Sequence, residues 1–175
     1  NDTTPTLSGT AEAASTVVIE SDILGTVGTA ITDGSGNWSI TTSILTEGDH
    51  ALTARQTDQY GNGPSIASAS LTVSIDETAP AVPVSLDLIS ASDSGSSSID
   101  NITSTTDPTI LGLADAGLNI TLSSDIDETV ATTTSGGAGI WLVTVSTLSE
   151  GTHLLTATTN DDAGNISAAS VALSV

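Results

Sequence analysis

The stretch GNWSITTSI, residues 36–44, decides the fold class. Trp38, Ile40 and Thr42 alternate with other residues and therefore share one face of an extended strand, and this two-residue period is typical of a half-buried β-strand. Residues 139–145, GIWLVTV, repeat the pattern around the second tryptophan. The segments between such stretches are rich in Gly, Asp and Asn, which favour turns. The sequence predicts strands joined by turns, and no helix.

The chain repeats itself at a constant offset of 103 residues. TPTLSG at Thr4–Gly9 returns as DPTILG at Asp107–Gly112. The same offset relates Gly36 to Gly139, Trp38 to Trp141, Glu47 to Glu150, His50 to His153, Asp58 to Asp161 and Asn62 to Asn165. Near the end, SASLTVSI (68–75) aligns with AASVALSV (168–175) at an offset of 100, which predicts three extra residues in the first copy around 63–65. Two copies of one module are expected.

Each copy reads as about seven short strands with a turn signal every 8 to 12 residues, which is typical of an immunoglobulin-like sandwich. The second copy has an additional leading segment at 83–104, in which SLDLIS is the expected first strand. The first copy begins within the equivalent loop, so it is expected to lack that strand. The predicted organisation is all-β, with two tandem immunoglobulin-like sandwiches at 1–75 and 81–175 joined end to end by a short rigid linker at 76–80.

The charge balance excludes several partners. The chain holds 21 acidic residues against one basic residue, Arg55, for a formal charge of −20. Nucleic acids and anionic membrane surfaces require the Lys and Arg that the chain lacks. It has no cysteine for disulfides or thiolate metal sites, no apolar run of about 20 residues that could insert into a membrane, and no recognisable signal peptide.

On this topology the acidic residues gather at the ends of each sandwich, because successive strands run in opposite directions. The loop after the first strand of the second copy is expected far from the linker and contains Asp93, Asp100 and Asn101. The loops expected beside the linker contain Asp115, Asp161, Asp162 and Asn165. The adjoining end of the first copy is expected to contribute Glu20, Asp22, Glu47 and Asp49, with Asp76 and Glu77 in the linker itself.

Such crowding of carboxylates calls for a cation. Two like charges about 4 Å apart repel by roughly 4 kcal/mol at an effective dielectric constant near 20. Calcium accepts roughly six to eight oxygen ligands in tolerant geometry, whereas zinc prefers the sulfur and clustered imidazole that are missing here. Proline limits the conformations of the linker DETAPAVP, residues 76–83. Calcium is therefore the expected cofactor and would fix the hinge; the alternative is that the acids form only a solvated surface, since Asp also favours turns.

The combination of GNWS at Gly36, DAGN at Asp162 and DETAP at Asp76 resembles the bacterial Ig-like repeats of giant, type I-secreted, RTX-type surface adhesins and biofilm-associated proteins. The resemblance covers nearly the whole chain. It implies a repeat in a long extender arm at the bacterial cell surface, outside the cell, which carries a distal ligand-binding region and is stiffened by calcium at its domain junctions.

The resemblance also implies a set of ligands. At the junction they are Asp76 with the neighbouring Glu77 or Thr78, and Asp161 or Asp162 across it. The loop with Asp93, Asp100 and Asn101 resembles the second acidic loop of that family, whose linker partner would follow Val175. A matching site in the first copy would lie around Asp58, where DQYGN departs from the second copy. The implied partners are neighbouring repeats of the same chain and a host or surface ligand bound elsewhere in the protein, and a monomer is expected.

Two rival functions remain open at this point. Catalysis is disfavoured because there is no GxSxG motif and no cysteine nucleophile. The two histidines, His50 and His153, occupy one repeated position, and the strand alternation places them on the same face as core residues. The repeats could instead bind a glycan or ice through the outward Thr152, Thr156 and Thr158, although threonine also simply favours strands. The two tryptophans recur on an apolar strand face and are expected in the core and not in sugar stacking.

Overall fold

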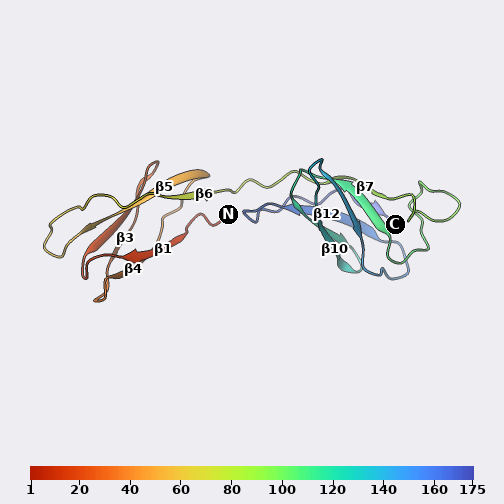
Figure 1. The fold of residues 1–175 in the computed structure, drawn as a ribbon. Helices are drawn as coiled ribbons and strands as arrows, with labels where there is room; N and C mark the ends of the chain where they lie inside the picture. The colour runs from red at the N-terminus through yellow and green to blue at the C-terminus, as the bar shows by residue number, and fades with distance from the viewer. The chain divides into compact units, whose positions relative to one another are not determined.

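The computed structural model describes all residues, 1–175, and its regular elements are β-strands throughout (Figure 1). The chain divides into two compact units, Asn1–Glu77 and Thr78–Val175. The structure contains no helix, and hence none that is long and apolar enough to cross a membrane. The predicted all-β fold class is confirmed.

The first unit is a sandwich of two antiparallel sheets. Four strands form a sheet in the order β3-β2-β5-β6, and β1 pairs with β4 in a sheet of two. The bounds are β1 Thr6–Thr10, β2 Thr16–Ser21, β3 Gly25–Ile31, β4 Asn37–Thr41, β5 Gly48–Thr57 and β6 Leu71–Ile75. The first unit therefore has six strands.

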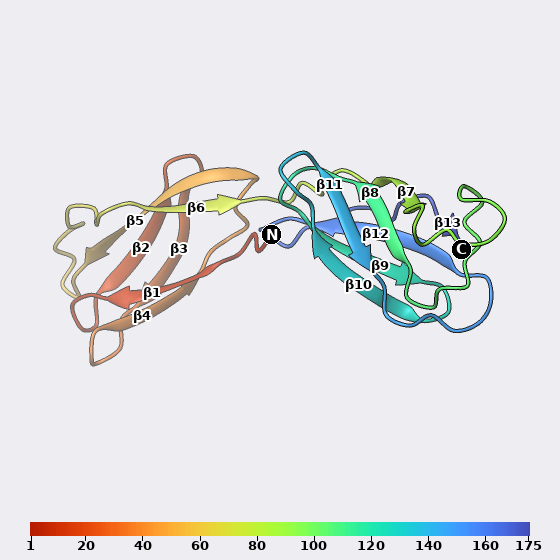
Figure 2. The same cartoon turned by 45° about the vertical axis from the view of Figure 1, so that its right-hand side comes forward.

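The second unit repeats this sandwich and adds one strand. Its larger sheet has the order β10-β9-β12-β13, and its smaller sheet has the order β11-β8-β7 (Figure 2). The bounds are β7 Val84–Leu88, β8 Thr109–Leu113, β9 Asn119–Ser124, β10 Glu128–Thr134, β11 Ile140–Thr144, β12 Leu154–Asn160 and β13 Leu173–Ser174. The predicted first strand, SLDLIS, is β7.

A tryptophan lies at the centre of each core, as the strand pattern predicts. Trp141 is 1% exposed and packs with Ile110, Leu122 and Leu155 between the sheets of the second unit. Trp38 packs against the equivalent core of the first unit but is only half-buried. The two copies therefore differ in how completely this ring is covered.

A glycine beneath each tryptophan explains the repeated PTxxG pattern. Gly112 on β8 is paired with Trp141 on β11, and Gly9 on β1 is paired with Trp38 on β4. A Cβ atom on Gly112 would overlap Cζ2 of the Trp141 ring, and one on Gly9 would also collide with its tryptophan. Any side chain at these positions would displace the ring, so the motif is a packing requirement.

The predicted alignment of the last strands is wrong by two residues. The N–H of Ser65 donates to the carbonyl of Gln56, and the N–H of Gln56 donates to the hydroxyl of Ser65. Ser167 makes the same two hydrogen bonds with Thr159. The two serines are therefore equivalent, at an offset of 102. The pairs Leu52 with Leu71 and Leu155 with Leu173 give the same offset. The first copy therefore has one extra residue, because Gly63 and Pro64 replace Ile166. Similar small apolar residues fit either alignment, and only strand pairing distinguishes them.

Candidate metal sites

Asp58 and Asp161, both expected as calcium ligands, are held in identical turns. The Oδ1 atom of Asp161 accepts a hydrogen bond from the backbone N–H of Asn165 at 2.8 Å, and its Oδ2 atom accepts one from Asn165 Nδ2 at 3.0 Å. Asn62 donates to Asp58 in the same way, at 2.7 and 2.6 Å. Each carboxylate is thus fixed in orientation by the asparagine four residues later.

These bonds favour the ionised carboxylate. The side chain and backbone of Asn62 lower the pKa of Asp58. At Asp161 desolvation raises the pKa, but the hydrogen bonds from Asn165, Ala163 and Gly164 together outweigh it, and the pKa is lowered. Both groups therefore remain charged at neutral pH, as a metal ligand must.

The same Asp-x-x-Gly-Asn turn occurs a third time, at Asp33–Asn37, where no metal was expected. Its counterpart in the second copy is GGAGI, residues 136–140, which has neither the Asp nor the Asn side chain. It still makes both backbone hydrogen bonds of the turn, from the N–H of Gly136 to the carbonyl of Ile140 and from the N–H of Gly139 to the carbonyl of Gly136. In the turns with Asp, one acidic side chain satisfies local N–H groups, which is an ordinary structural role. The sequence of the first copy contains this pattern twice, at Asp33 and at Asp58. That repetition indicates that Asp58 serves primarily to form a turn.

Asp93 differs from every other acid in the chain because it is buried. The residue is 5% exposed, and its Oδ1 atom is buried with no hydrogen-bond partner. Its Oδ2 atom accepts a bond from the backbone N–H of Asn101 at 3.3 Å. Asn101 has a φ of 59°, and its side-chain oxygen accepts a 3.4 Å bond from the N–H of Leu88. The loop 89–108 thus folds back and brings Asp93 and Asn101 together, while Asp100 is exposed.

The chemistry around Asp93 fits calcium. A buried carboxylate oxygen without a partner is costly, and a cation beside it would remove that cost. No three carboxylate or imidazole side chains lie together in an arrangement that could hold a metal ion. An ion at Asp93 would therefore rely on amide and carbonyl oxygens and water for its other ligands, which calcium accepts and zinc does not favour.

Three further expected ligands, in loops of the second unit, lie at its opposite end. Asp115 follows β8, and Asp161 and Asp162 follow β12, at the end where the chain enters before β7. The hydroxyl group of Thr159 donates to the carbonyl oxygen of Ala81 at 3.1 Å, which anchors that entering segment. Asp115 and Asp162 are exposed, and Asp161 is half-buried.

The other members of the expected junction set are divided between the units. Asp76 and Glu77 belong to the first unit, and Thr78 belongs to the second. Within the first unit, the N–H of Glu77 donates to Oε2 of Glu47 at 3.4 Å. Asp76 and Glu47 therefore lie at the end of the first unit where β6 finishes beside the start of β5.

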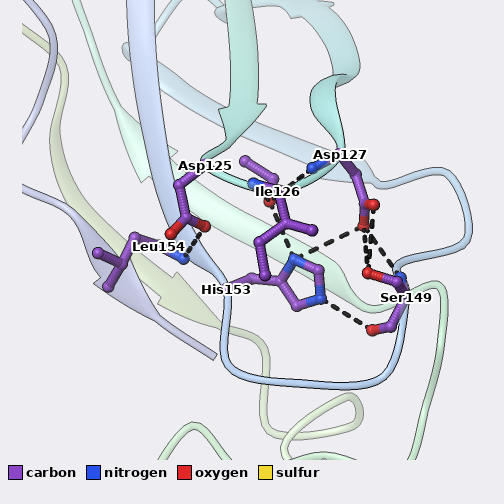
Figure 3. A network of polar contacts seen from close by, with 7 residues as sticks. Asp125, Ile126, Asp127, Ser149, His153 and Leu154 are labelled. Atoms are coloured by element: carbon purple, nitrogen blue, oxygen red, sulfur yellow. Dashed lines mark hydrogen bonds and ion pairs between the residues drawn. The ribbon is translucent and has the colours of Figure 1, made fainter.

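A second pair of aspartates has a structural role that the sequence did not indicate. Asp125 Oδ1 accepts a 2.8 Å bond from the N–H of Leu154 (Figure 3). In the first unit, Asp22 accepts the equivalent 2.9 Å bond from the N–H of Ala51. Each closes the end of a strand pair. Glu20 is also engaged, in an ion pair with Arg55 at 3.1 Å.

The two histidines are buried structural groups. Nε2 of His153 lies 2.8 Å from the carbonyl oxygen of Ser149, which can only accept, so Nε2 carries the proton (Figure 3). Nδ1 then accepts from the hydroxyl group of Ser124 at 2.9 Å, and that oxygen in turn accepts from the N–H of Ile126 and Asp127. His50 makes the same contacts with Ser21 and the carbonyl oxygen of Thr46.

Comparison with known proteins agrees with this architecture. The model of the bacterial Ig-like domain family matches residues 1–77 and again residues 78–175. Comparison with curated protein sequences gave no significant match.

Three solved structures illustrate the structural similarity. Fibronectin(III)-like modules of Clostridium thermocellum CbhA share 16% identity at a TM-score of 0.53, covering 97% of this chain and 82% of that one. A biofilm-associated protein BSP domain shares 20% identity at a TM-score of 0.40, covering 99% of this chain; this chain spans 27% of that structure. The D0-D1 domain of intimin shares 15% identity at a TM-score of 0.31, covering 99% and 91% of the two chains. With a family match to both units, the chain belongs to the bacterial Ig-like domain family, of which it carries two tandem copies.

Proposed function

We propose that this chain is part of the extender region of a bacterial surface adhesin. In this proposal, tandem Ig-like repeats project a distal ligand-binding region from the cell for adhesion or biofilm formation, after type I secretion of an RTX-type protein. The observation that carries the proposal is the tandem repetition of one bacterial Ig-like sandwich. Repeated modules of this kind add length, because each contacts only its neighbours in the chain.

The arrangement of the histidines supports a structural and not a catalytic role. Ser124, His153 and Asp127 have the composition of a catalytic triad, but His153 is 2% exposed and its Nε2 atom is bonded to a backbone carbonyl. The hydroxyl of Ser124 is on the Nδ1 side and accepts bonds from its own turn. A nucleophile needs access to substrate and a base at its hydroxyl that can release the proton, and this buried network provides neither.

Calcium is the proposed stiffening agent, at two kinds of site. One is the loop with Asp93, Asp100 and Asn101, supported by the buried, unpartnered Oδ1 atom of Asp93. The other is the junction set of Asp76, Glu77 or Thr78 with Asp115, Asp161 and Asp162, supported by the formal charge of −20 and by the fixed, ionised carboxylate of Asp161. Bound calcium would supply positive charge and additional coordination at these oxygens.

Calcium should raise the melting temperature of the chain and stiffen it. With a dissociation constant in the range of about 10⁻⁴ to 10⁻³ M, about 10 mM calcium stabilises a bound unit by about 1.4–2.7 kcal/mol. The measurement is a thermal melt with small-angle scattering, first in calcium and then in excess chelator, with magnesium as the ion control. Trp38 fluorescence reports the first unit and Trp141 fluorescence the second.

The variants separate the two kinds of site. Asp93→Asn should reduce the calcium-dependent rise of the Trp141 transition, and Asp76→Asn should abolish the stiffening while leaving both transitions near their normal temperatures. Asp87→Asn is the matched control, because Asp87 is exposed on β7 outside both sites. Equal melting and equal scattering with calcium and with chelator would contradict the calcium proposal, while the extender role would still rest on the tandem repeats.

One face of the second unit favours a second candidate, direct binding of a glycan or ice. Across the register of β10, β9 and β12, Thr132 pairs with Thr121, which pairs with Thr158. The flanking rows are Thr134, Asn119 and Asn160 on one side and Thr129, Ser123 and Thr156 on the other. This three-by-three array is uncharged, with neighbours about 4.8 Å apart across strands and about 6.8 Å apart along them.

The first unit provides the control for this face. There the central row is Thr29, Val18 and Arg55, and Arg55 pairs with Glu20, so the array is interrupted. Thr121→Lys changes the centre of the array, and Val18→Lys changes the equivalent position of the first unit. Ice-recrystallisation inhibition or glycan binding that falls about tenfold or more in Thr121→Lys and not in Val18→Lys would support this candidate. No activity of the wild-type chain in either assay would contradict it.

A further inference from the structure

The first unit has an open apolar groove along one side of β1. The groove has a volume of about 580 Å³ and is lined by β1, by the ring of Trp38, by β5 and by the segment 65–71. Leu7 and Trp38 are half-buried at its floor, and Leu71 is 51% exposed at its rim. Contiguous exposed apolar surface of this kind marks a place where another apolar segment can bind.

The second unit shows what fills the same place. There β7 pairs with β8, the counterpart of β1, through Val84 with Leu113, Asp87 with Leu111 and Leu88 with Ile110. Leu88 is 4% exposed, and Leu86 packs against the same core. Four groove residues are more deeply covered in the second unit. The counterparts of Leu7, Trp38, Ala54 and Leu71 are Ile110 at 0%, Trp141 at 1%, Ala157 at 0% and Leu173 at 8%.

The open side of β1 also offers backbone hydrogen-bonding groups. In the second unit, the carbonyl oxygen of Thr109 accepts from the N–H of Ile89, just after β7, and alternate residues of β8 face β7 in the same way. At the offset of 103, the equivalent residues of β1 are Thr6, Ser8 and Thr10. Pro5 and Ala11 bond on the opposite side, to Thr42 and Gly36 beside β4. The groups of Thr6, Ser8 and Thr10 therefore form a free strand edge.

We propose that the groove of the first unit is an acceptor for one added β-strand with the apolar alternation of β7. The strand would run antiparallel to β1, in the register that β7 takes on β8, and its two alternating leucines would cover Leu7 and Trp38. Backbone bonds to Thr6, Ser8 and Thr10 would supply affinity, and the groove would select the apolar alternation, as in other cases of strand addition. An unpaired edge beside an apolar groove is the feature that such strands recognise.

The first test is binding of a peptide with the sequence AVPVSLDLIS, residues 81–90, to the full chain at moderate salt. The peptide contains no tryptophan, so acrylamide quenching reports the chain alone. Saturating peptide should lower the quenching of Trp38, which is half-buried, and leave Trp141 unchanged because it is already 1% exposed. Trp38→Phe should remove the peptide-dependent signal.

Two controls test the mode of binding. A peptide with Leu86→Asp and Leu88→Asp should bind at least about tenfold more weakly, because it places charge in the apolar groove. Ser8→Pro in the chain removes one N–H from the open edge and no bond to β4, and proline is tolerated at such an edge position. Ser8→Pro should weaken the binding of the wild-type peptide, whereas Thr41→Ser on β4 should leave the binding unchanged.

A fused strand gives an independent measurement. Placing residues 78–103 directly before Asn1 reproduces the connection that precedes Ser104, the counterpart of Asn1. The first unit should then melt at a higher temperature, with Trp38 as protected as Trp141. If the free peptide fails to bind and Trp38 stays equally accessible in the fused chain, the inference is overturned. It is also overturned if sedimentation shows that a second copy of the chain already covers Trp38.

Discussion

Trp141→Ala should destabilise the second unit by about 3–5 kcal/mol, the usual cost of removing a large aromatic side chain from a core. Trp141 is 1% exposed and packs against residues of both sheets. Gly112 lies under the ring with no side chain that could fill the space. Because a domain of this size has a total stability of about 5–15 kcal/mol, such a loss approaches unfolding.

The measurement is urea denaturation followed by circular dichroism and by tryptophan fluorescence, from Trp38 in Trp141→Ala and from Trp141 in Trp38→Ala, which separates the two units. The matched variant is Trp38→Ala, which should cost about half as much or less because that ring is only half-buried. Gly112→Ala should destabilise the second unit by about 1–3 kcal/mol by forcing the ring aside. A cost for Trp141→Ala no greater than that for Trp38→Ala would contradict the central role of the ring in the second core.

The sequence predicted the fold well because the features that decide it are local or periodic. The alternation around Trp38 indicates a strand with one buried face, and the offset of 103 residues identifies the modules. The alignment of the last strands failed because a shift of two residues keeps the parity of an alternating strand. The bonds of Ser65 and Ser167, which depend on tertiary pairing, provide the correct register.

The candidate metal sites were less predictable, because an acidic loop residue can serve a turn or an ion. Asp58 was grouped with the expected ligands, yet its bonds to Asn62 give it a complete structural role. Asp93 has no such distinguishing pattern in the sequence. Its burial and its unpartnered oxygen arise only when the loop folds back onto β7, and they make it the strongest candidate ligand within one unit.

His153→Leu should destabilise the second unit by about 2–5 kcal/mol, although leucine has a similar volume. The substitution leaves the hydroxyl proton of the buried Ser124 without an acceptor and the part-buried carbonyl of Ser149 without its donor. Each such group costs about 1–3 kcal/mol. The measurement is urea denaturation followed by Trp141 fluorescence.

Two further variants show whether the cost comes from lost hydrogen bonds. Asp127→Leu introduces the residue that the first copy has at Leu24 and keeps the histidine. It removes the carboxylate that accepts the N–H of Ser149 at 2.9 Å, but Ser149 is exposed and can bond to water instead, so the variant should cost about 1 kcal/mol. The double variant Ser124→Ala with His153→Leu removes the orphaned hydroxyl, so it should cost less than the sum of the single variants by about 0.5–3 kcal/mol. Additive costs would show that packing, and not the bond between Ser124 and His153, holds the ring. His50→Leu should destabilise the first unit by a similar amount, because His50 makes the same contacts with Ser21 and Thr46. Such a result would show that both copies use the histidine to join their strands.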